Sequence, residues 1–442
     1  MRAMKEADTL IHAAWVAPVE PAGVLLERHS VAVLDGRIAA LLPTDEVPGA
    51  WSAREEVRLD RHLLIPGLVN LHGHAAMAML RGIADDLPLM AWLKDHVWPA
   101  EARHVGDEFV HDGSLLAAAE MLRGGITCFN DMYFFPEATA RAALRAGIRA
   151  ALGMIAVEFP SAYAPDSAGY LHKGLAMRDA YRGEELLSFC LAPHAPYTVA
   201  DATLSRIATL SEEIDAPIHI HVHETADEIA QGLAAHGTRP LERLRRLGIV
   251  GPRLIAVHAV HLEEGEIELL AREGASIAHC PSSNLKLASG IAPVAACLAR
   301  GVNVGLGTDG AASNNRLDIL GEMRTAALLA KGASGDARAV GAHEALRLAT
   351  LDGARALGLD SRIGSIVAGK SADLAAVELS SPETLPCFDP VSDLVYAAGR
   401  EHVTHVWVAG EARLAGRRMA GVDEDELRAK AAWWRQRIRN PS

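Results

Sequence analysis

Four groups of histidine and carboxylate side chains stand at or directly after short apolar segments of this 442-residue chain. The first is His72-Gly-His74, and the second is the stretch His219–Glu224, which holds three alternating histidines. His258 follows a third apolar segment, and Asp309 follows the last one within Thr-Asp-Gly. Imidazole nitrogens together with a carboxylate oxygen are typical ligands of a borderline divalent cation. The four groups therefore point to a metal site.

The spacing of these residues supports that interpretation. Residues two apart in a strand point to the same side, so His72 and His74 can direct two rings at one point. A third nitrogen from His221 and a carboxylate oxygen from Asp309 complete a set of three nitrogens and one oxygen. An isolated His-x-His pair or Thr-Asp-Gly turn is common without any metal. Their joint occurrence at four strand ends favours a metal centre over four unrelated surface groups.

The elements that must position these groups form a regular series. Eight short apolar segments alternate with Ala- and Leu-rich helical patterns, which is the count of a (β/α)8 TIM barrel of the α/β class. In chain order they are Leu64–Leu71, Ile126–Asn130, Ala150–Val157, Leu187–Leu191, Pro217–Val222, Leu254–Val257, Ala275–Ala278 and Val302–Leu306. The carboxyl ends of barrel strands share one rim, where active sites lie. All four groups fall at that rim.

Both ends of the chain have a different character, with short strands and turns such as Asp8–Val16 and Ser30–Leu42. We expect residues 1–62 and 363–442 to form one small β-sandwich domain, the second part ending in a charged helix over 423–439. Residues 63–362 then form the barrel. Closure of a barrel brings its first and last elements together, so one chain can build both domains.

A doubly wound open sheet is the structural alternative, because it shows the same alternation of strands and helices. That fold predicts a glycine-rich phosphate turn after the first strand, where this chain has His72-Gly-His74. Two literal phosphate-loop matches occur elsewhere, at Gly305–Gly310 and Gly364–Ser371. The first follows the last strand, and the second leads into a strand instead of a helix, so neither predicts a nucleotide site.

The composition excludes several classes of protein. There are 43 basic and 56 acidic residues, which give a net charge of −13. A chain this acidic is not expected to bind nucleic acid or an anionic membrane, because phosphate contacts need clustered Lys and Arg. Its 5 cysteines are odd in number and form no Cys-x-x-Cys pair. Together with a charged N-terminal segment and the absence of a long apolar run, this favours a cytoplasmic enzyme.

The sequence resembles the amidohydrolase superfamily, in the branch with a His-x-His pair, histidines after the fifth and sixth strands and an aspartate after the eighth. The resemblance covers nearly the whole chain. Within that branch it is similar to deaminases of 5′-methylthioadenosine and S-adenosylhomocysteine, through segments with family-like motifs: His74–Met77, Leu80–Trp92, Trp98–Glu101, Pro193–Tyr197, His221–Glu224, Val257–His261, Ser283–Leu287 and Gly307–Asn315. It implies hydrolysis of a C–N bond in a cyclic amidine by a homo-oligomer.

The resemblance also assigns the metal ligands. They are the four residues already selected by the strand argument: His72, His74, His221 and Asp309. The fourth strand ends in Pro193-His194 and offers no lysine for a bridge between two ions, so one ion per chain is expected. Zn²⁺ suits such ligands best, with Fe²⁺ and Mn²⁺ as alternatives.

Catalytic roles follow from the same resemblance. Asp309 would also take the proton of a water whose pKa the metal lowers to about 7. Glu224 would protonate a ring nitrogen of the purine, and His258 would bond the attacking oxygen and the alkoxide that develops. From the sequence alone, Glu224 could equally be an acid favoured by the dipole of the next helix.

For substrate contacts the resemblance selects Trp92, Glu101, His194, Glu224 and Ser313. Trp92 would give an apolar wall, and Glu101 would accept both hydroxyls of a ribose. Without the resemblance, Trp92 reads as an ordinary core residue and Glu101 as a solvated charge. One departure concerns the arginines that hold a homocysteine carboxylate, because residues 157–170 contain none. This ranks 5′-methylthioadenosine ahead of S-adenosylhomocysteine as the expected small-molecule substrate.

Two other functions stay open at this stage. The same site could deaminate or dechlorinate another purine, a pyrimidine or a triazine, although a free base would not need Glu101. A scaffold without activity would have lost a ligand or Glu224, and this chain keeps all of them.

Overall fold

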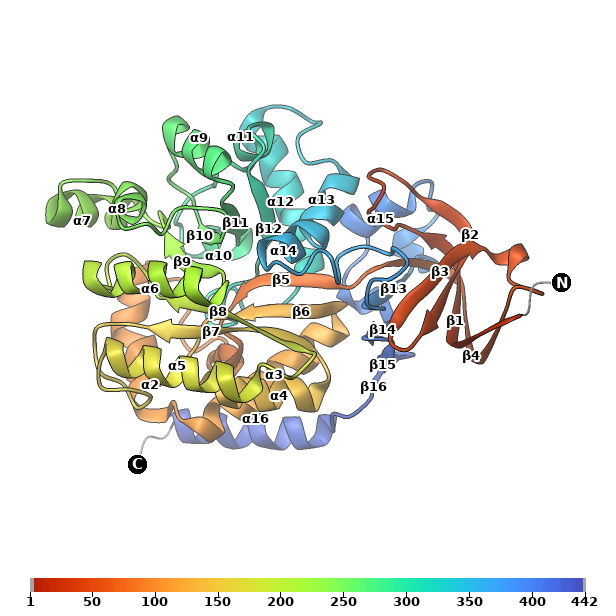
Figure 1. The fold of residues 1–442 in the computed structure, drawn as a ribbon, viewed down its shortest axis with the longest axis horizontal. Coiled ribbons are helices and arrows are strands. Elements are labelled where there is room, and N and C mark those ends of the chain that lie inside the picture. Colours follow the sequence, from red (N-terminus) through yellow and green to blue (C-terminus); the bar gives the residue numbers. More distant parts are fainter. Residues whose placement is uncertain (1–3, 440–442) are drawn as a thin grey trace.

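The computed structural model describes residues 4–439 and contains two eight-stranded sheets. One is a barrel of parallel strands, and the other joins both ends of the chain (Figure 1). The predicted (β/α)8 barrel and the separate sheet from both ends are therefore confirmed. In Figure 1 the terminal sheet lies at the right, and most of the barrel helices lie to its left.

The barrel strands follow one another in sequence order, each parallel to the next. They are β5 (Leu68–Gly73), β6 (Ile126–Asp131), β7 (Arg149–Ala156), β8 (Leu187–Pro193), β9 (Ile218–Val222), β10 (Leu254–His258), β11 (Ser276–His279) and β12 (Asn303–Leu306). Each corresponds to one predicted apolar segment. They are almost wholly buried, as parallel strands covered on both faces must be.

The barrel closes where its first and last strands meet. The backbone N–H groups of Thr308 and Asp309 donate to the carbonyl of His72 at 3.1 and 3.0 Å. Gly307 allows this approach, because a Cβ atom there would lie 2.8 Å from the Cβ of His72. The closure brings Asp309 beside the His72-Gly-His74 motif, although more than 230 residues separate them.

Helices pack around the barrel and over its strand ends. One group covers the strands: α3 (Asp107–Arg123), α4 (Pro136–Ala146), α5 (Ser167–Tyr181), α6 (Asp201–Ile214), α9 (Glu264–Glu273), α11 (Val294–Ala299), α12 (Ile319–Ser334), α13 (Ala342–Leu348) and α14 (Leu351–Ala356). The others lie in segments that follow strand ends: α1 (Leu89–Trp92), α2 (Trp98–His104), α7 (Ala226–His236), α8 (Pro240–Arg246) and α10 (Pro281–Lys286). The main core lies between the strands and the covering helices.

The second sheet has the order β16-β15-β14-β13-β4-β1-β2-β3. Its strands are β1 (Lys5–Val16), β2 (Leu26–Leu34), β3 (Arg37–Pro43), β4 (Trp51–Pro66), β13 (Leu374–Glu378), β14 (Val403–Val408), β15 (Glu411–Ala415) and β16 (Arg418–Met419). Strand β4 pairs with both β1 and β13, so it links the two chain ends. It also runs through residue 62, where we predicted the first domain to end. A buried ion pair between Arg149 and Asp373, 2.7 Å long, ties this sheet to the barrel.

The last helix, α16 (Glu424–Arg439), leaves the terminal sheet and returns to the barrel. It lies along α3, below the barrel in Figure 1. The indole of Trp434 donates to the carboxylate of Asp112 at 3.1 Å. Helix α15 (Pro390–Tyr396) packs against α13 and α12 on the other side of the barrel. None of the helices within residues 4–439 has the length and apolar character needed to cross a membrane.

Candidate active site

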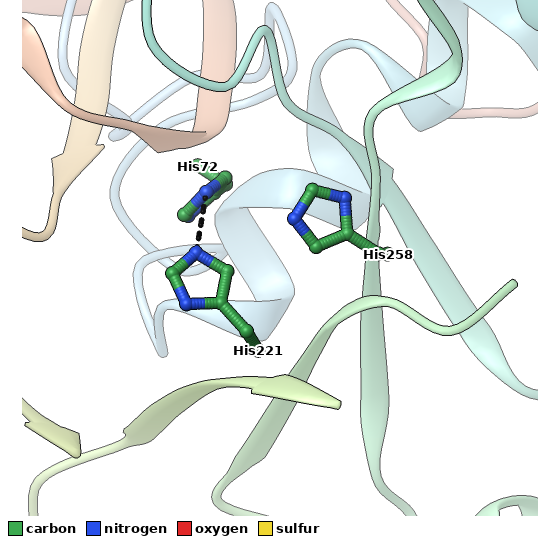
Figure 2. A group of neighbouring side chains, drawn as sticks. All are labelled: His72, His221 and His258. Atoms are coloured by element: carbon green, nitrogen blue, oxygen red, sulfur yellow. Dashed lines mark hydrogen bonds between the residues drawn. The ribbon is translucent and has the colours of Figure 1, made fainter. Parts of the chain in front are cut away.

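The predicted ligands meet at the carboxyl ends of the barrel strands. His72 lies in β5 and His74 directly follows it, His221 lies in β9, and Asp309 follows β12. The Oδ1 atom of Asp309 is 3.3 Å from Nε2 of His72 and 3.2 Å from Nε2 of His74. The Nε2 atoms of His72 and His221 are 3.2 Å apart, and His258 lies beside them (Figure 2). One small space thus receives groups from four strands.

In the rings of His74 and His221, the contact made by Nδ1 shows that Nε2 is the nitrogen facing this space. Nδ1 of His74 lies 2.6 Å from the carbonyl oxygen of Met132, and Nδ1 of His221 lies 2.7 Å from that of His194. A carbonyl can only accept, so each Nδ1 carries a proton and each Nε2 faces the shared space. Imidazole nitrogens and a carboxylate oxygen that converge in this way suit a divalent cation.

Two overlapping sets of side chains could hold such a cation. His72, His74 and Asp309 form one set, and His72, His221 and His258 form the other. Within each set the nearest ligand atoms lie within 4.8 Å of one another. The four predicted ligands are thus divided between two sets that share His72. His258, predicted to bond the attacking oxygen, is close enough to belong to the second.

Asp309 is held as an ionised carboxylate by its surroundings. Burial opposes its ionisation, but the rings of His72 and His74 hold the pKa of this carboxyl well below its usual range. The hydroxyl groups of Ser283 and Ser313 donate to its other oxygen, Oδ2, at 2.5 and 2.8 Å. Ser313 was predicted to contact substrate, whereas here it lies behind Asp309 and is 2% exposed. Its observed contact orients the carboxylate.

Glu224 reaches the same space from the turn after β9. Its side chain is buried, and Oε2 lies 3.8 Å from Nε2 of His258. Burial raises the pKa of Glu224 above its ordinary value. A carboxyl group with a raised pKa keeps a proton closer to neutral pH, which suits a proton donor. The geometry therefore gives Glu224 the position of an acid beside the metal ligands.

Glu228, which the sequence reading missed, holds the turn that carries Glu224. Its two carboxylate oxygens accept the backbone N–H groups of His223 and Glu224 at 2.8 and 2.9 Å. Thr225 caps α7 by accepting from the N–H of Glu228 at 3.2 Å. A signal for it exists in the sequence, since Thr225 followed by Glu228 is the pattern of a helix capping box.

The remaining predicted substrate residues line a pocket around the ligands. Trp92, Glu101 and His194 all belong to its wall, together with Tyr133, which the sequence analysis did not select. The hydroxyl of Tyr133 donates to Glu101 at 2.6 Å, and burial raises the pKa of Glu101 to about 7. No sequence motif marked Tyr133, because only the packing of α2 against the turn after β6 brings the two residues together.

Other histidines near the ligands have structural contacts. His219 places Nε2 at 2.9 Å from Nδ1 of His72, so it supports the orientation of that ring. His223 has a φ of 55° and turns away, and its Nε2 accepts from the N–H of Leu241 at 3.1 Å. His261 has its Nε2 2.8 Å from the carbonyl oxygen of Ser289. His279 is buried at the end of β11.

Comparisons with known proteins find a matching family and similar full-length sequences. The profile of the amidohydrolase family matches residues 63–413. A protein of Teredinibacter turnerae named 5-methylthioadenosine/S-adenosylhomocysteine deaminase is 47% identical over 98% of both chains. A protein of Saccharophagus degradans with the same name is 46% identical over 98% of this chain and 97% of its own.

Two solved structures are similar to this chain in fold. The chain resembles a zinc-bound adenosine deaminase from Xanthomonas campestris with a TM-score of 0.98 and 50% identity, over 99% of this chain and 100% of the other. It also resembles the atrazine chlorohydrolase of Arthrobacter aurescens with a TM-score of 0.89, over 96% of this chain and 99% of the other. That second likeness, at 24% identity, concerns the fold alone.

Proposed function

The chain belongs to the amidohydrolase family, and from that premise we propose that it deaminates an adenine nucleoside by hydrolysis. The preferred substrate is 5′-methylthioadenosine, which gives 5′-methylthioinosine and ammonia. The observation that carries this proposal is the convergence of His72, His74, His221 and Asp309 at one point, with Glu224 beside them. The names of full-length relatives support the choice of substrate.

We propose that the four converging residues hold one divalent cation, with Zn²⁺ as the first choice. Their donor set of three imidazole nitrogens and one carboxylate oxygen fits that ion, and Fe²⁺ or Mn²⁺ can use the same ligands. A cation at this point supplies hydroxide at neutral pH, because it lowers the pKa of a water ligand to about 7.

The side chains then divide the proton transfers between them. Asp309 accepts the proton of the attacking water, because its neighbours hold it ionised and the two serines fix its orientation. Glu224 donates a proton to the ring nitrogen next to the amino-bearing carbon, which makes that carbon more electrophilic. His258 forms a hydrogen bond with the oxygen added to the ring. Asp309 then passes the proton that it took from water to the amino group, ammonia leaves, and the hydroxyl group left on the ring returns its proton to Glu224 as the carbonyl forms.

The sugar end of the substrate is recognised by Glu101 in this proposal. A carboxylate offers two acceptor oxygens, which suits the two neighbouring hydroxyl groups of a ribose. Tyr133 fixes one of these oxygens, and Trp92 forms an apolar wall of the same pocket. A free purine base or a triazine has no group that would use Glu101. We also propose, from the sequence, that the protein is a cytoplasmic homo-oligomer.

A substrate panel tests the proposal. Metal-loaded protein is given 5′-methylthioadenosine, S-adenosylhomocysteine, adenosine, guanine and a chlorotriazine, and ammonia or chloride release is measured. We expect the highest kcat/KM for 5′-methylthioadenosine and no turnover of the triazine. Failure of metal-loaded protein to release ammonia from 5′-methylthioadenosine would overturn the proposed function.

A further inference from the structure

A cavity of about 980 Å³ opens beside the pocket that holds the metal ligands. It is bounded by α2, by the turns after β6, β7 and β8, and by α7 and α8, which gather at the left of Figure 1. The metal pocket itself measures only about 100 Å³. Five residues belong to the walls of both spaces: Trp98, Glu101, Phe134, Phe159 and Tyr197. The two spaces are therefore compartments of one site.

The sizes of the two compartments fix how a nucleoside can lie in them. Sites for small molecules typically measure roughly 300–1,000 Å³, so the metal pocket alone is too small for a whole nucleoside. The purine ring must enter the small compartment, because the reacting carbon has to reach Asp309 and Glu224. Glu101 stands at the junction, where the proposed function places the ribose. The 5′ substituent then points into the large cavity, which exceeds the needs of a methylthio group many times over.

The wall of the large cavity is mainly apolar and aromatic. Its apolar members include Trp98, Val105, Phe134, Phe135, Phe159 and Tyr163. Arg243 is the only arginine or lysine among its lining residues, all of which fall within residues 4–439. That guanidinium is already bonded to Asp201 at 2.7 Å and to the carbonyl of Val199 at 3.0 Å.

The other charges near the cavity do not provide a free cation either. Lys173 stands next to Tyr163 and donates to its carbonyl oxygen. Glu158 and Glu228 add negative charge to the wall, and His236 is exposed at its edge. A homocysteine carboxylate would meet acids and aromatic rings here, without an unpaired arginine or lysine to neutralise it. An apolar substituent would instead replace water along the aromatic wall.

We propose that the large cavity is a subsite for bulky apolar 5′-thio substituents. The chain would then favour adenosine thioethers with alkyl or aryl groups larger than methyl, and would discriminate against the zwitterionic homocysteine group. This inference rests on the proposed function, because it uses the same metal pocket and the same orientation of the nucleoside. It adds which 5′ substituents the enzyme selects.

The test compares three substrates with the metal-loaded protein: 5′-methylthioadenosine, 5′-benzylthio-5′-deoxyadenosine and S-adenosylhomocysteine. We expect kcat/KM for the benzylthio compound to exceed that for the methylthio compound by about tenfold, since a buried phenyl ring adds a large apolar contact. S-adenosylhomocysteine should rank below both. A benzylthio compound that is turned over no better than the methylthio compound would overturn the subsite.

Filling the cavity gives a second test. Ala234 and Ala235 are both exposed on α7, but only Ala235 lines the cavity. Ala235→Trp should lower kcat/KM for the benzylthio substrate by about tenfold and change the methylthio value less than about twofold. The matched control Ala234→Trp should change neither. Ala162→Trp, from the turn after β7, fills the same cavity and serves if the helix variant folds poorly.

The outcomes separate this inference from the proposed function. If the unmodified, metal-loaded protein turns over none of the thioethers, the proposed function itself is contradicted. The subsite alone is contradicted if the unmodified protein turns over 5′-methylthioadenosine well, but Ala235→Trp and Ala162→Trp lower kcat/KM equally for the methylthio and benzylthio substrates. A substrate-selective loss in the filling variants, absent in Ala234→Trp, supports it.

Discussion

Replacement of Glu101 by glutamine should weaken catalysis and stabilise the fold at the same time. Burial raises the pKa of Glu101 from 4.5 to about 7. The folded state therefore disfavours the ionised carboxylate, whereas the unfolded chain ionises it freely above about pH 4.5. The resulting cost is absent at low pH, grows between about pH 4.5 and 7, and is complete above pH 7.

The size of this cost follows from the gap between the two pKa values. It corresponds to at most about 3 kcal/mol above pH 7 and to less than about 1 kcal/mol at pH 5. Glu101→Gln removes the charge but keeps an oxygen that can accept from the hydroxyl of Tyr133. The variant should therefore exceed the wild type in unfolding free energy by about 2–3 kcal/mol at pH 8, with little difference at pH 5.

The same variant should lose activity, because glutamine has one acceptor oxygen where the ribose hydroxyls need two. A hydrogen bond to a charged group contributes about 1.5–3 kcal/mol, so kcat/KM for 5′-methylthioadenosine should fall roughly 10- to 100-fold. 2′,3′-Dideoxyadenosine lacks both hydroxyls and should be turned over at similar rates by both proteins.

Urea unfolding at pH 5 and pH 8, together with kinetics on both nucleosides, measures these effects. The control is Glu55→Gln, a change at an exposed carboxylate of β4, which should alter neither stability nor activity. A Glu101→Gln variant that is less stable than wild type at pH 8 would refute the electrostatic reasoning. Equal activity losses on the two nucleosides would refute the assignment of Glu101 to the ribose.

Three further predictions follow from contacts around the site and the terminal helix. Glu228→Ala removes the acceptor of two backbone N–H groups, those of His223 and Glu224, so kcat should fall about tenfold or more while bound metal stays constant. Kinetics together with elemental analysis checks this prediction, and an unchanged kcat contradicts it. His219→Phe removes the ring that supports His72, so metal affinity should fall roughly 10- to 100-fold in chelator competition, and unaltered affinity contradicts the support role. Trp434→Ala should lower the unfolding free energy by about 3 kcal/mol and leave kcat/KM unchanged, because the buried indole packs α16 onto the barrel. Trp433→Ala, at the exposed neighbouring position, should lower the unfolding free energy by less than about 1 kcal/mol. Urea unfolding measures both values, and similar losses in the two variants contradict the packing of α16.

The strands and the candidate ligands were predictable because both depend on local regularities. An apolar segment bounded by turns predicts a buried strand, and a parallel barrel collects the carboxyl ends of all its strands at one rim. His72, His74, His221 and Asp309 needed no further information to be placed near one another. The sequence also predicted that both chain ends form one domain of strands. The order of these strands, in which β4 pairs with β13 and so joins the two ends in one sheet, was not predictable, because pairing partners depend on tertiary structure.

Residues that act through the packing of distant segments escaped the sequence reading. Tyr133 meets Glu101 only because α2 folds over the turn after β6. In a regular strand His223 would share the face of His221, but β9 ends at Val222 and a positive φ turns His223 away. The large apolar cavity is built by three turns and three helices that no local pattern connects.

The central claim is that the converging residues form a metal-dependent deaminase site in which Glu224 transfers protons. It is tested most directly by measuring ammonia release from 5′-methylthioadenosine at matched metal content, in the wild type and in Glu224→Gln. We predict about one metal ion per chain in both proteins, rapid ammonia release by the wild type, its loss after metal removal, and a rate at least about 100-fold lower in the variant. A metal-loaded Glu224→Gln protein that releases ammonia at the wild-type rate would contradict the account.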